Sequence, residues 1–483
     1  MIGSSRHEGM MQRLLLGRMF QGRLLPESMR TDAGGRVERR TDIRFSFDGL
    51  DYLGCGGDTL ASALLANGVH LVGRSVKYHR PRGIMASGAE EANALVTVMR
   101  GGGRVTPNLR ATQVELYEGL EAHSQNRWPS LGTDFGAVAG LAGPMLSAGF
   151  YYKTLMGPRG LGLWHRLFEP LVRRAAGLGR APGLADPDRY ARYYEHCDVL
   201  VVGAGPAGIA AALAAGRAGK RVILCDEQAE PGGSLLTEIA ALVEGVPARD
   251  WLARSLGELA GMANVEVMAR TTAFGCYPHN MVGLAERVTE HLAVPDAGLL
   301  REVLWRVRAG RVVLAAGAIE RPLVFAGNDR PGVMLAGAAR DYLLRWGVKV
   351  GSRVVVATSC DTAYRAALDL AAAGVEVKVI VDLRPVAEGA WPAAARAAGI
   401  AVLAGGRVLG THMRGKRIDS VLLGRGDDGR RRWFDCDALL MGNGWVPSVH
   451  LFSQARGRLR WDEGRGVFLP GEDVAGTRRC REC

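Results

Sequence analysis

A glycine-rich segment at residues 203–208 carries the clearest chemical signal in the sequence. It reads Gly203-Ala-Gly205-Pro206-Ala207-Gly208 and follows an apolar run at 199–202. Between a strand and a helix, glycines at this spacing allow a tight turn, close approach of the backbone to a pyrophosphate, and close helix–strand packing. The helix N-terminus adds free N–H groups and a partial positive charge. The pattern predicts a dinucleotide site; the alternative is a glycine-rich turn in an α/β domain that binds no nucleotide.

An acidic pair marks the expected adenosine end of this site. Residues 220–226 read as the next strand, which ends at Asp226 and is followed by Glu227. A carboxylate at this place accepts hydrogen bonds from ribose hydroxyls. The pair disfavours NADP, because the 2′-phosphate would face two carboxylates. The motif alone leaves the choice between NAD and FAD open.

A second strand–turn–helix unit follows without the glycines. Residues 353–358 and 375–382 read as strands on either side of a helix at 361–374, and the turn is Ala357-Thr-Ser-Cys-Asp-Thr-Ala. No glycine occupies a position of this turn that corresponds to the glycine pattern at 203–208. The side chains present there keep the backbone away from a pyrophosphate. We expect a degenerate, structural copy of the nucleotide domain, as the second domain of a two-domain flavoprotein plan.

The N-terminal part predicts a small β-grasp domain. Residues 43–52 alternate around Asp48-Gly49, which is a hairpin signal, and 58–68 read as a helix that ends at Asn-Gly. This plan is similar to plant-type ferredoxins, whose next loop carries cluster cysteines. Here the loop at 83–98 has none, and a 2Fe–2S cluster needs four ligands. We therefore expect the fold without the cluster.

The expected fold class is α/β, with a two-dinucleotide-binding-domain fold preceded by the β-grasp domain. Basic residues at 74–82 indicate either a phosphate or partner contact or a solvated loop. The expected parts of the chain are a flexible N-terminus at 1–40, the β-grasp domain at 41–103, a wrapping connector at 104–197, the NAD-type dinucleotide domain at 198–336, the degenerate second domain at 337–434, and a return to the first domain with a tail at 435–483.

Bulk composition narrows the function classes. The net charge of +12 is spread over 483 residues without a long block of one sign, which argues against nucleic acid as a partner. Eight scattered cysteines fit reduced, buried thiols in a cytoplasmic protein. The uncharged stretches at 135–152 and 199–216 are not read as membrane spans, because glycine and proline interrupt one and the other is the nucleotide motif. We expect no metal site.

Four longer stretches resemble the alpha subunit of heterotetrameric sarcosine oxidase. They cover 57–83, 108–117, 123–130 and 317–333, within a match from about 22 to 476. The resemblance implies an oxidoreductase that converts sarcosine to glycine and formaldehyde and reduces oxygen to peroxide. It also implies a cytoplasmic complex with beta, gamma and delta subunits. FAD and FMN would lie on the beta subunit or at its interface with this chain, and the fingerprint of this chain would hold NAD.

The resemblance also assigns nucleotide contacts by position. It implies contacts in the glycine turn, at the ribose, beside the adenosine and on the third strand, made by Ala207, Asp226, Glu227, Gln228, Ser234 and Ala273. The candidate site is completed by the motif residues Gly203, Gly205, Pro206, Gly208 and Gly233. No catalytic residue is assigned, because no acid–base pair or nucleophile stands out.

The chain departs from the resemblance at its end. Residues 470–476 are followed by a short tail in place of a folate-binding half, so we expect a truncated or frame-shifted end. Cys480 and Cys483 lack a second ligand pair and are not read as a zinc or redox site. The alternatives are the alpha-type subunit of an opine oxidase, dye-linked proline dehydrogenase or hydrogen cyanide synthase, and a non-catalytic nucleotide-binding scaffold. We expect the chain to be inactive without its partner subunits.

Overall fold

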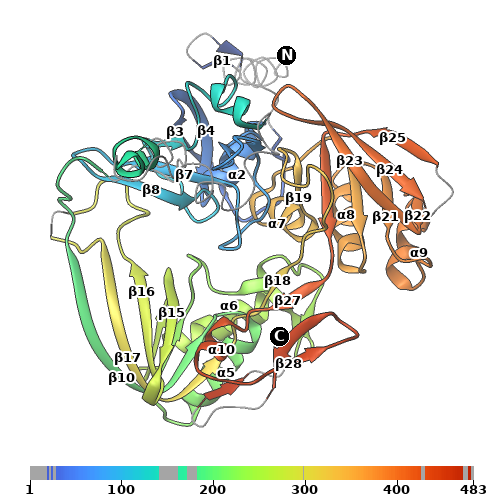
Figure 1. The fold of residues 1–483 in the computed structure, drawn as a ribbon. Coiled ribbons are helices and arrows are strands. Elements are labelled where there is room, and N and C mark those ends of the chain that lie inside the picture. Colours follow the sequence, from blue (N-terminus) through green and yellow to red (C-terminus); the bar gives the residue numbers. More distant parts are fainter. Residues whose placement is uncertain are drawn as a thin grey trace, which may run out of the picture.

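A five-stranded sheet packed on one helix forms the N-terminal part of the computed structural model (Figure 1). The structure describes residues 29–140, 162–170, 182–296, 298–425 and 430–471, and the backbone of 19–20, 23–24 and 477–479. The sheet order is β4-β3-β9-β7-β8. Its strands are β3 (Glu38–Phe47), β4 (Leu50–Gly56), β7 (Leu95–Met99), β8 (Val105–Arg110) and β9 (Leu120–Ser124). The predicted hairpin around Asp48-Gly49 is therefore present as β3 and β4.

Helix α2 (Leu60–Ala66) is buried at every residue, and its side chains are leucine and alanine except for Ser62. It begins with a capping box, in which the Thr59 side chain accepts from the backbone N–H of Ser62 and the Ser62 hydroxyl accepts from the N–H of Thr59. Short two-residue pairs complete this part of the chain: β1 (Met19–Phe20) with β2 (Arg23–Leu24), and β5 (Gly73–Arg74) with β6 (Pro81–Arg82).

The β-grasp sheet runs past the expected limit at residue 103, because β8 and β9 belong to it. The connector, expected at 104–197, also ends earlier than residue 197, because strand β10 of the first dinucleotide domain begins at Tyr190. Strand β8 contains Pro107 and has no fully buried residue, so it lacks the alternation that marks a strand in a sequence. The described part of the connector holds η1 (Phe135–Gly140) and η2 (Trp164–Phe168).

Three arginines of the basic stretch at 74–82 bind groups of this chain, although the Arg80 side chain is still 57 % exposed. Arg80 and Arg82 both pair with Asp329, at 3.0 and 2.9 Å. Arg74 donates to the backbone carbonyls of Leu131 and His79. Arg80 and Arg82 therefore bind a distant segment of the chain, and Arg74 binds both a distant segment and the stretch itself.

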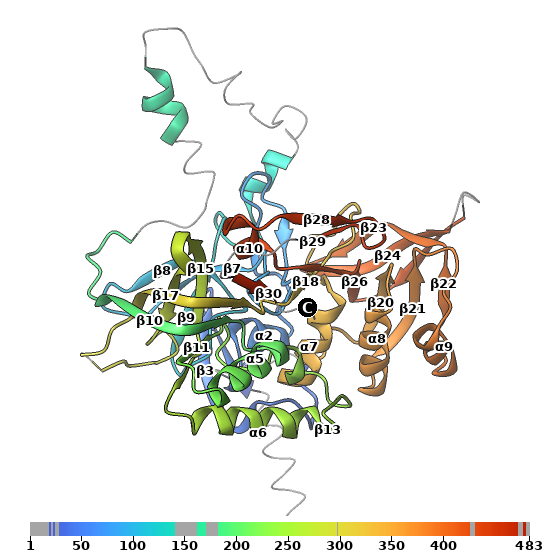
Figure 2. The same cartoon turned by 90° about the horizontal axis from the view of Figure 1, so that it is seen from below.

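A mostly parallel sheet forms the first dinucleotide domain, with the order β14-β11-β10-β17-β16-β15 and β30 beside β17. Its strands are β10 (Tyr190–Val202), β11 (Val222–Cys225), β14 (Val265–Met268), β15 (Thr271–Tyr277), β16 (Met281–Arg287), β17 (Glu302–Leu314) and β30 (Thr477–Arg479). Helices α5 (Pro206–Arg217) and α6 (Ala248–Ala260) lie along one face (Figure 2). The smaller elements are η3 (Gly233–Leu236), β12 (Leu242–Val243), β13 (Val246–Pro247) and η4 (Pro278–Asn280).

A parallel five-stranded sheet forms the second domain, in the order β19-β26-β20-β21-β22. Its strands are β19 (Val333–Leu335), β20 (Arg353–Thr358), β21 (Glu376–Asp382), β22 (Val402–Ala404) and β26 (Ala438–Gly442). Its helices are α7 (Ala336–Trp346), α8 (Thr362–Ala372) and α9 (Ala390–Ala397). An antiparallel sheet adjoins it, made of β23 (Gly406–Arg414), β24 (Arg417–Arg425) and β25 (Arg431–Asp435).

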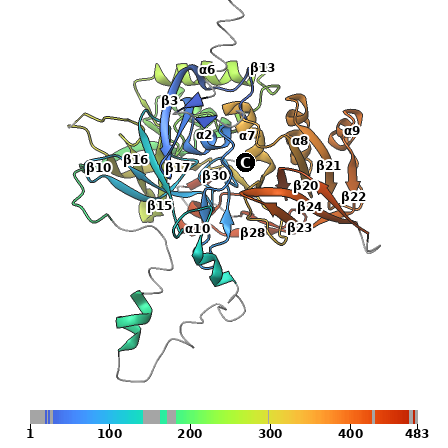
Figure 3. The ribbon, with the colours of Figure 1, turned by 90° about the horizontal axis from the view of Figure 1, so that it is seen from above.

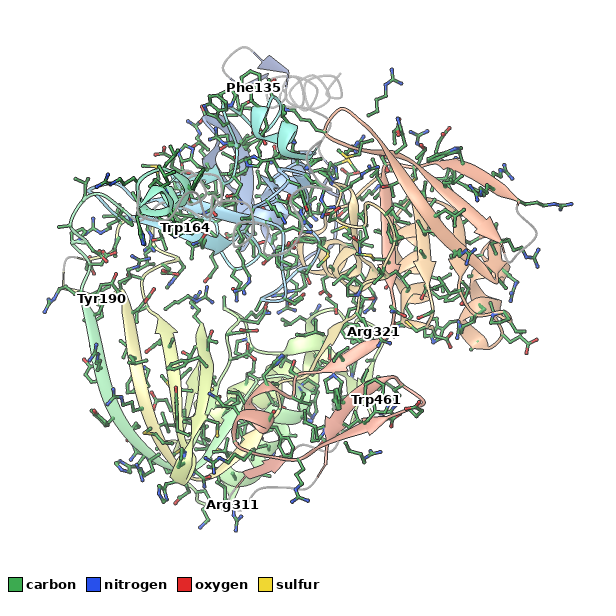
Figure 4. The ribbon with its side chains drawn as sticks, in the orientation of Figure 1. Phe135, Trp164, Tyr190, Arg311, Arg321 and Trp461 are labelled. Atoms are coloured by element: carbon green, nitrogen blue, oxygen red, sulfur yellow. The ribbon has the colours of Figure 1, made fainter. Side chains whose placement is uncertain are left out.

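The two chain crossings between the dinucleotide domains lie side by side. Strand β18 (Ala318–Glu320) leaves the first domain and pairs with β27 (Trp445–Pro447), which returns to it. The return therefore begins after β26, and not at the expected residue 435. It continues through α10 (His450–Gln454), β28 (Leu459–Asp462) and β29 (Val467–Pro470). Arg321, labelled in Figure 4, lies at this junction. Its side chain donates to the backbone carbonyls of Asn443 and Gly466.

The β-grasp domain and the second domain share one continuous hydrophobic core. Helix α7 lies between α2 and α8, as Figures 2 and 3 both show. Its Tyr342 hydroxyl donates to the carbonyl of Ala86 at 2.9 Å, and Trp346 Nε1–H donates to that of Gly57 at 3.1 Å. The expected α/β plan is confirmed, and α7 fixes how the two domains sit together. None of the described helices has the length and apolar character needed to cross a membrane.

Candidate nucleotide-binding site

A cavity of about 1100 Å³ lies where the three parts of the chain meet. The first dinucleotide domain lines it with the glycine turn and residues 315–320, the second with α7, and the β-grasp domain with 87–90. Its volume suits a ligand as large as a dinucleotide. All but one of the predicted site residues line it: Gly203, Gly205, Pro206, Ala207, Asp226, Glu227, Gln228, Gly233, Ser234 and Ala273. The exception, Gly208, packs behind the turn.

The three fingerprint glycines meet different surroundings. Gly203 has φ +101°, and a Cβ atom there would lie 2.3 Å from the carbonyl oxygen of Ala315. A Cβ atom on Gly208 would lie 1.8 Å from the carbonyl oxygen of Gly203. A Cβ atom on Gly205 would meet nothing within 4 Å. The first and third glycines are thus required by the protein itself, whereas Gly205 leaves open space on the cavity side of the turn.

Helix α5 begins at this turn without a side-chain cap. Gly205 is the N-cap, Pro206 occupies the first turn, and no side chain accepts from the N-terminal N–H groups. Pro206 suits this position because it has no N–H to satisfy. The remaining N–H groups, together with the positive end of the helix dipole, are available to an anionic group.

Asp226 ties the end of β11 to the glycine turn. Its carboxylate accepts from the N–H of Ala204 at 2.6 Å and from the N–H of Gln228 at 2.8 Å. Burial raises the pKa of Asp226, and these two donors counteract the effect. A carboxylate has about four acceptor positions, so ribose hydroxyls can still bind to it. The pKa of neighbouring Glu227 is raised by burial and by the charges of Asp226 and Glu90.

Arginines from the second domain complete the cavity, and no motif in the sequence pointed to them. Arg345 donates to Gln228 Oε1 at 3.3 Å, and burial lowers its pKa. Arg340 pairs with Glu238 at 3.0 Å, and Arg365 pairs with the same carboxylate. Glu238 therefore joins the first domain to α7 and α8 of the second across the cavity wall.

In the second domain, the turn that corresponds to the fingerprint is filled by its own contacts. The N–H of Ser359 donates to the carbonyl of Gly442 at 3.1 Å, and that of Cys360 donates to Thr358 Oγ1 at 3.0 Å. Asp382, at the end of β21, has no exposed side-chain surface and accepts from the hydroxyl of Tyr364 at 2.7 Å. These contacts use the groups that would otherwise bind a second nucleotide, so we continue to regard this domain as structural.

A buried carboxylate organises the loop at 83–98. Glu91 is 2 % exposed and accepts four backbone N–H groups, from Met85 at 2.8 Å, Ala86 at 2.7 Å, Asn93 at 2.7 Å and Ala94 at 3.0 Å. Burial raises the pKa of Glu91, and the four donors oppose that rise. The loop therefore folds around a carboxylate of its own.

The described cysteines are free thiols. Cys55, Cys197, Cys225, Cys276 and Cys436 are buried, and Cys360 is half-buried. Burial raises the pKa of Cys197, Cys225 and Cys436 to about 12, so these thiols are poor nucleophiles at neutral pH. Within the described ranges, no three His, Cys, Asp or Glu side chains gather as a metal site. Cys480 and Cys483 lie outside these ranges.

Comparison with known families identifies the nucleotide-binding part. A family model described as pyridine nucleotide-disulphide oxidoreductase matches residues 197–469, more than half of the chain. The chain belongs to this family. The description of this family names a pyridine nucleotide. The two-domain fold and the cavity at the glycine turn agree with nucleotide binding. A second model, described as a 2Fe-2S iron-sulfur cluster binding domain, matches residues 40–127 and agrees with the β-grasp fold and with its observed limit at Ser124.

Individual relatives confirm the resemblance stated from the sequence. The alpha subunit of sarcosine oxidase from Rhizobium meliloti (strain 1021) is 52 % identical over 93 % of this chain and 45 % of its own length. The same protein from Corynebacterium sp. (strain P-1) is 39 % identical over 91 % of this chain and 41 % of its own length. The chain thus spans less than half of these curated relatives. L-proline dehydrogenase from P. horikoshii shares the fold, with a TM-score of 0.62 at 20 % identity over 94 % of this chain and 70 % of that one.

The residues of the β-grasp domain do not fit the cluster that the second family model describes. Cys55 is the only cysteine between residues 40 and 127, and a 2Fe–2S cluster needs four ligands. Glu91 already occupies the centre of the loop at 83–98. We expect purified protein to contain neither iron nor acid-labile sulfide and to show no cluster absorption in the visible spectrum. Stoichiometric iron and sulfide would contradict this expectation.

Proposed function

We propose that the chain is the alpha-type subunit of a multisubunit, flavin-dependent sarcosine oxidase, to which it contributes an NAD-binding domain. The observation that carries the proposal is the conjunction of the cavity at the glycine turn with 52 % identity, over nearly the whole chain, to a sarcosine oxidase alpha subunit. In this proposal the complex is cytoplasmic and includes beta, gamma and delta subunits. Its reaction is the oxidation of sarcosine to glycine and formaldehyde with formation of peroxide.

NAD is the proposed ligand of this chain because the charges around its cavity disfavour NADP and the resemblance to sarcosine oxidase alpha subunits favours NAD over FAD. Asp226 and Glu227 are suited to ribose hydroxyls and oppose a 2′-phosphate, which disfavours NADP. The open side of Gly205 and the uncapped start of α5 would receive the pyrophosphate. Gln228, Ser234 and Ala273 would surround the adenosine. The flavins, FAD and FMN, would supply the redox chemistry on the beta subunit or at its interface with this chain.

Opine oxidase is the second candidate, and it has weaker support. An opine oxidase subunit of Agrobacterium tumefaciens (strain Ach5) is 36 % identical to this chain, but the match covers 38 % of this chain and 36 % of the relative. The HcnB subunit of hydrogen cyanide synthase from Pseudomonas aeruginosa is 32 % identical over 38 % of this chain and 38 % of its own length. Both matches are far shorter than those with the sarcosine oxidase proteins.

A peroxide assay tests the proposed activity. The chain is purified alone and with the cognate beta, gamma and delta subunits, and peroxide is followed after addition of sarcosine, proline or an opine. We expect peroxide from sarcosine in the complex and none from the isolated chain, because in this proposal the flavin sites lie on the beta subunit or need it for completion at the interface. Activity with an opine but not with sarcosine would favour the second candidate. Peroxide from the isolated chain would contradict the assignment of the flavins.

A further inference from the structure

A second cavity, of about 150 Å³, lies between the β-grasp domain and the first dinucleotide domain. The β-grasp domain lines it with residues of 98–115, on β7, β8 and the turn after them, and the dinucleotide domain lines it with residues of 270–291. Strand β8 lies above the end of β16 at this junction in Figure 1. Among the described residues, Thr272 alone lines both this cavity and the one at the glycine turn. The second cavity is therefore a separate space, with room for about five water molecules or one small ligand.

Charged side chains of both signs line the second cavity, and each of its two acids is held by an arginine. Glu115 accepts from Arg270 with both carboxylate oxygens, at 2.6 and 2.7 Å. Glu290 accepts from Arg100 at 3.1 Å and from Arg301, which does not line the cavity, at 2.9 Å. The negative charges of the wall are thus already neutralised.

The other two arginines of the wall have no carboxylate within ion-pair distance among the described residues. Arg110 donates to the carbonyl of Glu91 at 3.2 Å and to Gln113 Oε1 at 3.4 Å. Arg287 donates to the carbonyls of Gln113 at 3.1 Å and of Glu227 at 2.7 Å. The carboxylate of Glu227 acts on both arginines only at longer range. With four arginines against two acids, the wall carries an excess of positive charge.

The imidazole of His291 adds an unused hydrogen-bonding atom to this wall. Its Nδ1 is buried and has no partner among the described residues. Burial and the charges of Arg270 and Arg287 lower the pKa of His291, so the ring is uncharged at neutral pH. A neutral imidazole carries one N–H, which can lie on Nδ1 and donate to an anion. A buried polar atom without a protein partner commonly indicates a ligand or water at that place.

We propose that the second cavity binds one small oxyanion, a phosphate or a carboxylate, between Arg110, Arg287 and His291. Both kinds of ligand present paired oxygens, which match the planar fork of an arginine. Arg110 is the last residue of β8 and Arg287 the last residue of β16, so the anion joins the β-grasp domain to the first dinucleotide domain. The site is independent of the proposed binding of NAD.

Calorimetry on the full chain at neutral pH tests the site. Sodium phosphate and sodium acetate are the titrants, and sodium chloride at equal ionic strength is the reference. The titrations are repeated on Gly205→Ala, in which a methyl group fills the open side of the glycine turn, the other place where an anion could bind. We expect one phosphate or one acetate per chain, with a dissociation constant of about 1 mM or lower, in both proteins. The thermal midpoint should rise with the concentration of the bound anion.

Variants assign the binding to the cavity. Arg110→Gln and Arg287→Gln should each weaken the anion about tenfold or more, because each removes a charged hydrogen-bond donor. His291→Phe keeps a ring but removes Nδ1, and should weaken the anion by a smaller factor. The control Arg308→Gln removes an exposed arginine of β17 that does not line the cavity, and should leave the affinity unchanged.

The titrations have outcomes that separate the possibilities. Saturable binding that is lost with the two arginines supports the inference, and the tighter of the two anions identifies the ligand class. No saturable heat beyond that of chloride would overturn it, and the cavity would then hold only water. Binding that persists in Arg110→Gln and Arg287→Gln, or disappears in Gly205→Ala, would also overturn it, because the anion would lie elsewhere. Arg110 is exposed, so its variant decides the matter even if Arg287→Gln does not fold.

Discussion

Replacement of Gly208 by alanine is expected to abolish nucleotide retention and to destabilise the first dinucleotide domain by about 1–3 kcal/mol. The added Cβ would lie 1.8 Å from the carbonyl oxygen of Gly203, a backbone atom that cannot turn away as a side chain can. Either α5 or the turn must shift. Both shifts displace the N–H groups at the start of the helix. The thermal midpoint and the nucleotide content of purified protein measure the two effects.

Two other glycines serve as matched controls for Gly208. Gly205→Ala should fold with wild-type stability, because its Cβ meets nothing within 4 Å, yet it should lose nucleotide because the methyl group occupies the approach of the pyrophosphate. Gly257→Ala, inside α6 and also without a neighbour within 4 Å, should bind normally and gain about 0.5–1 kcal/mol of stability. Normal stability and nucleotide content in Gly208→Ala would show that the turn is misdescribed.

Replacement of Glu91 by leucine is expected to unfold the loop at 83–98 and to cost at least about 2 kcal/mol of stability. It removes the acceptor of four backbone N–H groups, of which those of Ala86 and Ala94 are buried, and each buried group left without an acceptor costs about 1–3 kcal/mol. Because Ala86 also accepts from Tyr342 of α7, the effect should reach the shared core. Hydrogen exchange of residues 83–98, with the thermal midpoint, measures both the local and the wider effect.

A graded series separates the hydrogen bonds of Glu91 from its volume. Glu91→Gln keeps one acceptor oxygen and should fall between the wild type and Glu91→Leu. Glu121→Gln is the control, because Glu121 is a half-exposed residue of β9 paired with His123, and it should change stability by less than about 0.5 kcal/mol. Unchanged hydrogen exchange in Glu91→Leu would mean that the loop is held together by other contacts.

The parts of this molecule that sequence could predict are those that depend on local backbone geometry. The spacing of Gly203, Gly205 and Gly208 and the acid at the end of β11 follow from how a strand, a turn and a helix must join. They predicted the position of the cavity. The hairpin at Asp48-Gly49 was predicted for the same reason, since both residues take a positive φ.

Features that depend on contacts between distant segments were not predicted. Strand β8 does not alternate apolar and polar residues, because its position in the sheet is set by pairing with β7. The predicted β-grasp domain therefore ended at residue 103, before this strand. Strand β26 was assigned to the return segment, but it pairs with β20 inside the second domain. Arg340, Arg345 and Arg365 are ordinary helix residues in the sequence, and only the packing of α7 and α8 against the first domain brings them to the cavity.

The identity of the nucleotide released on denaturation tests the central claim most directly. Purified chain is denatured, and the supernatant is separated by chromatography and identified by mass and absorbance. We predict NAD, and a strongly reduced amount from Asp226→Ala, which loses both the proposed ribose acceptor and the hydrogen bond to the N–H of Ala204. Release of FAD or NADP in place of NAD, or equal NAD from Asp226→Ala, would contradict the account.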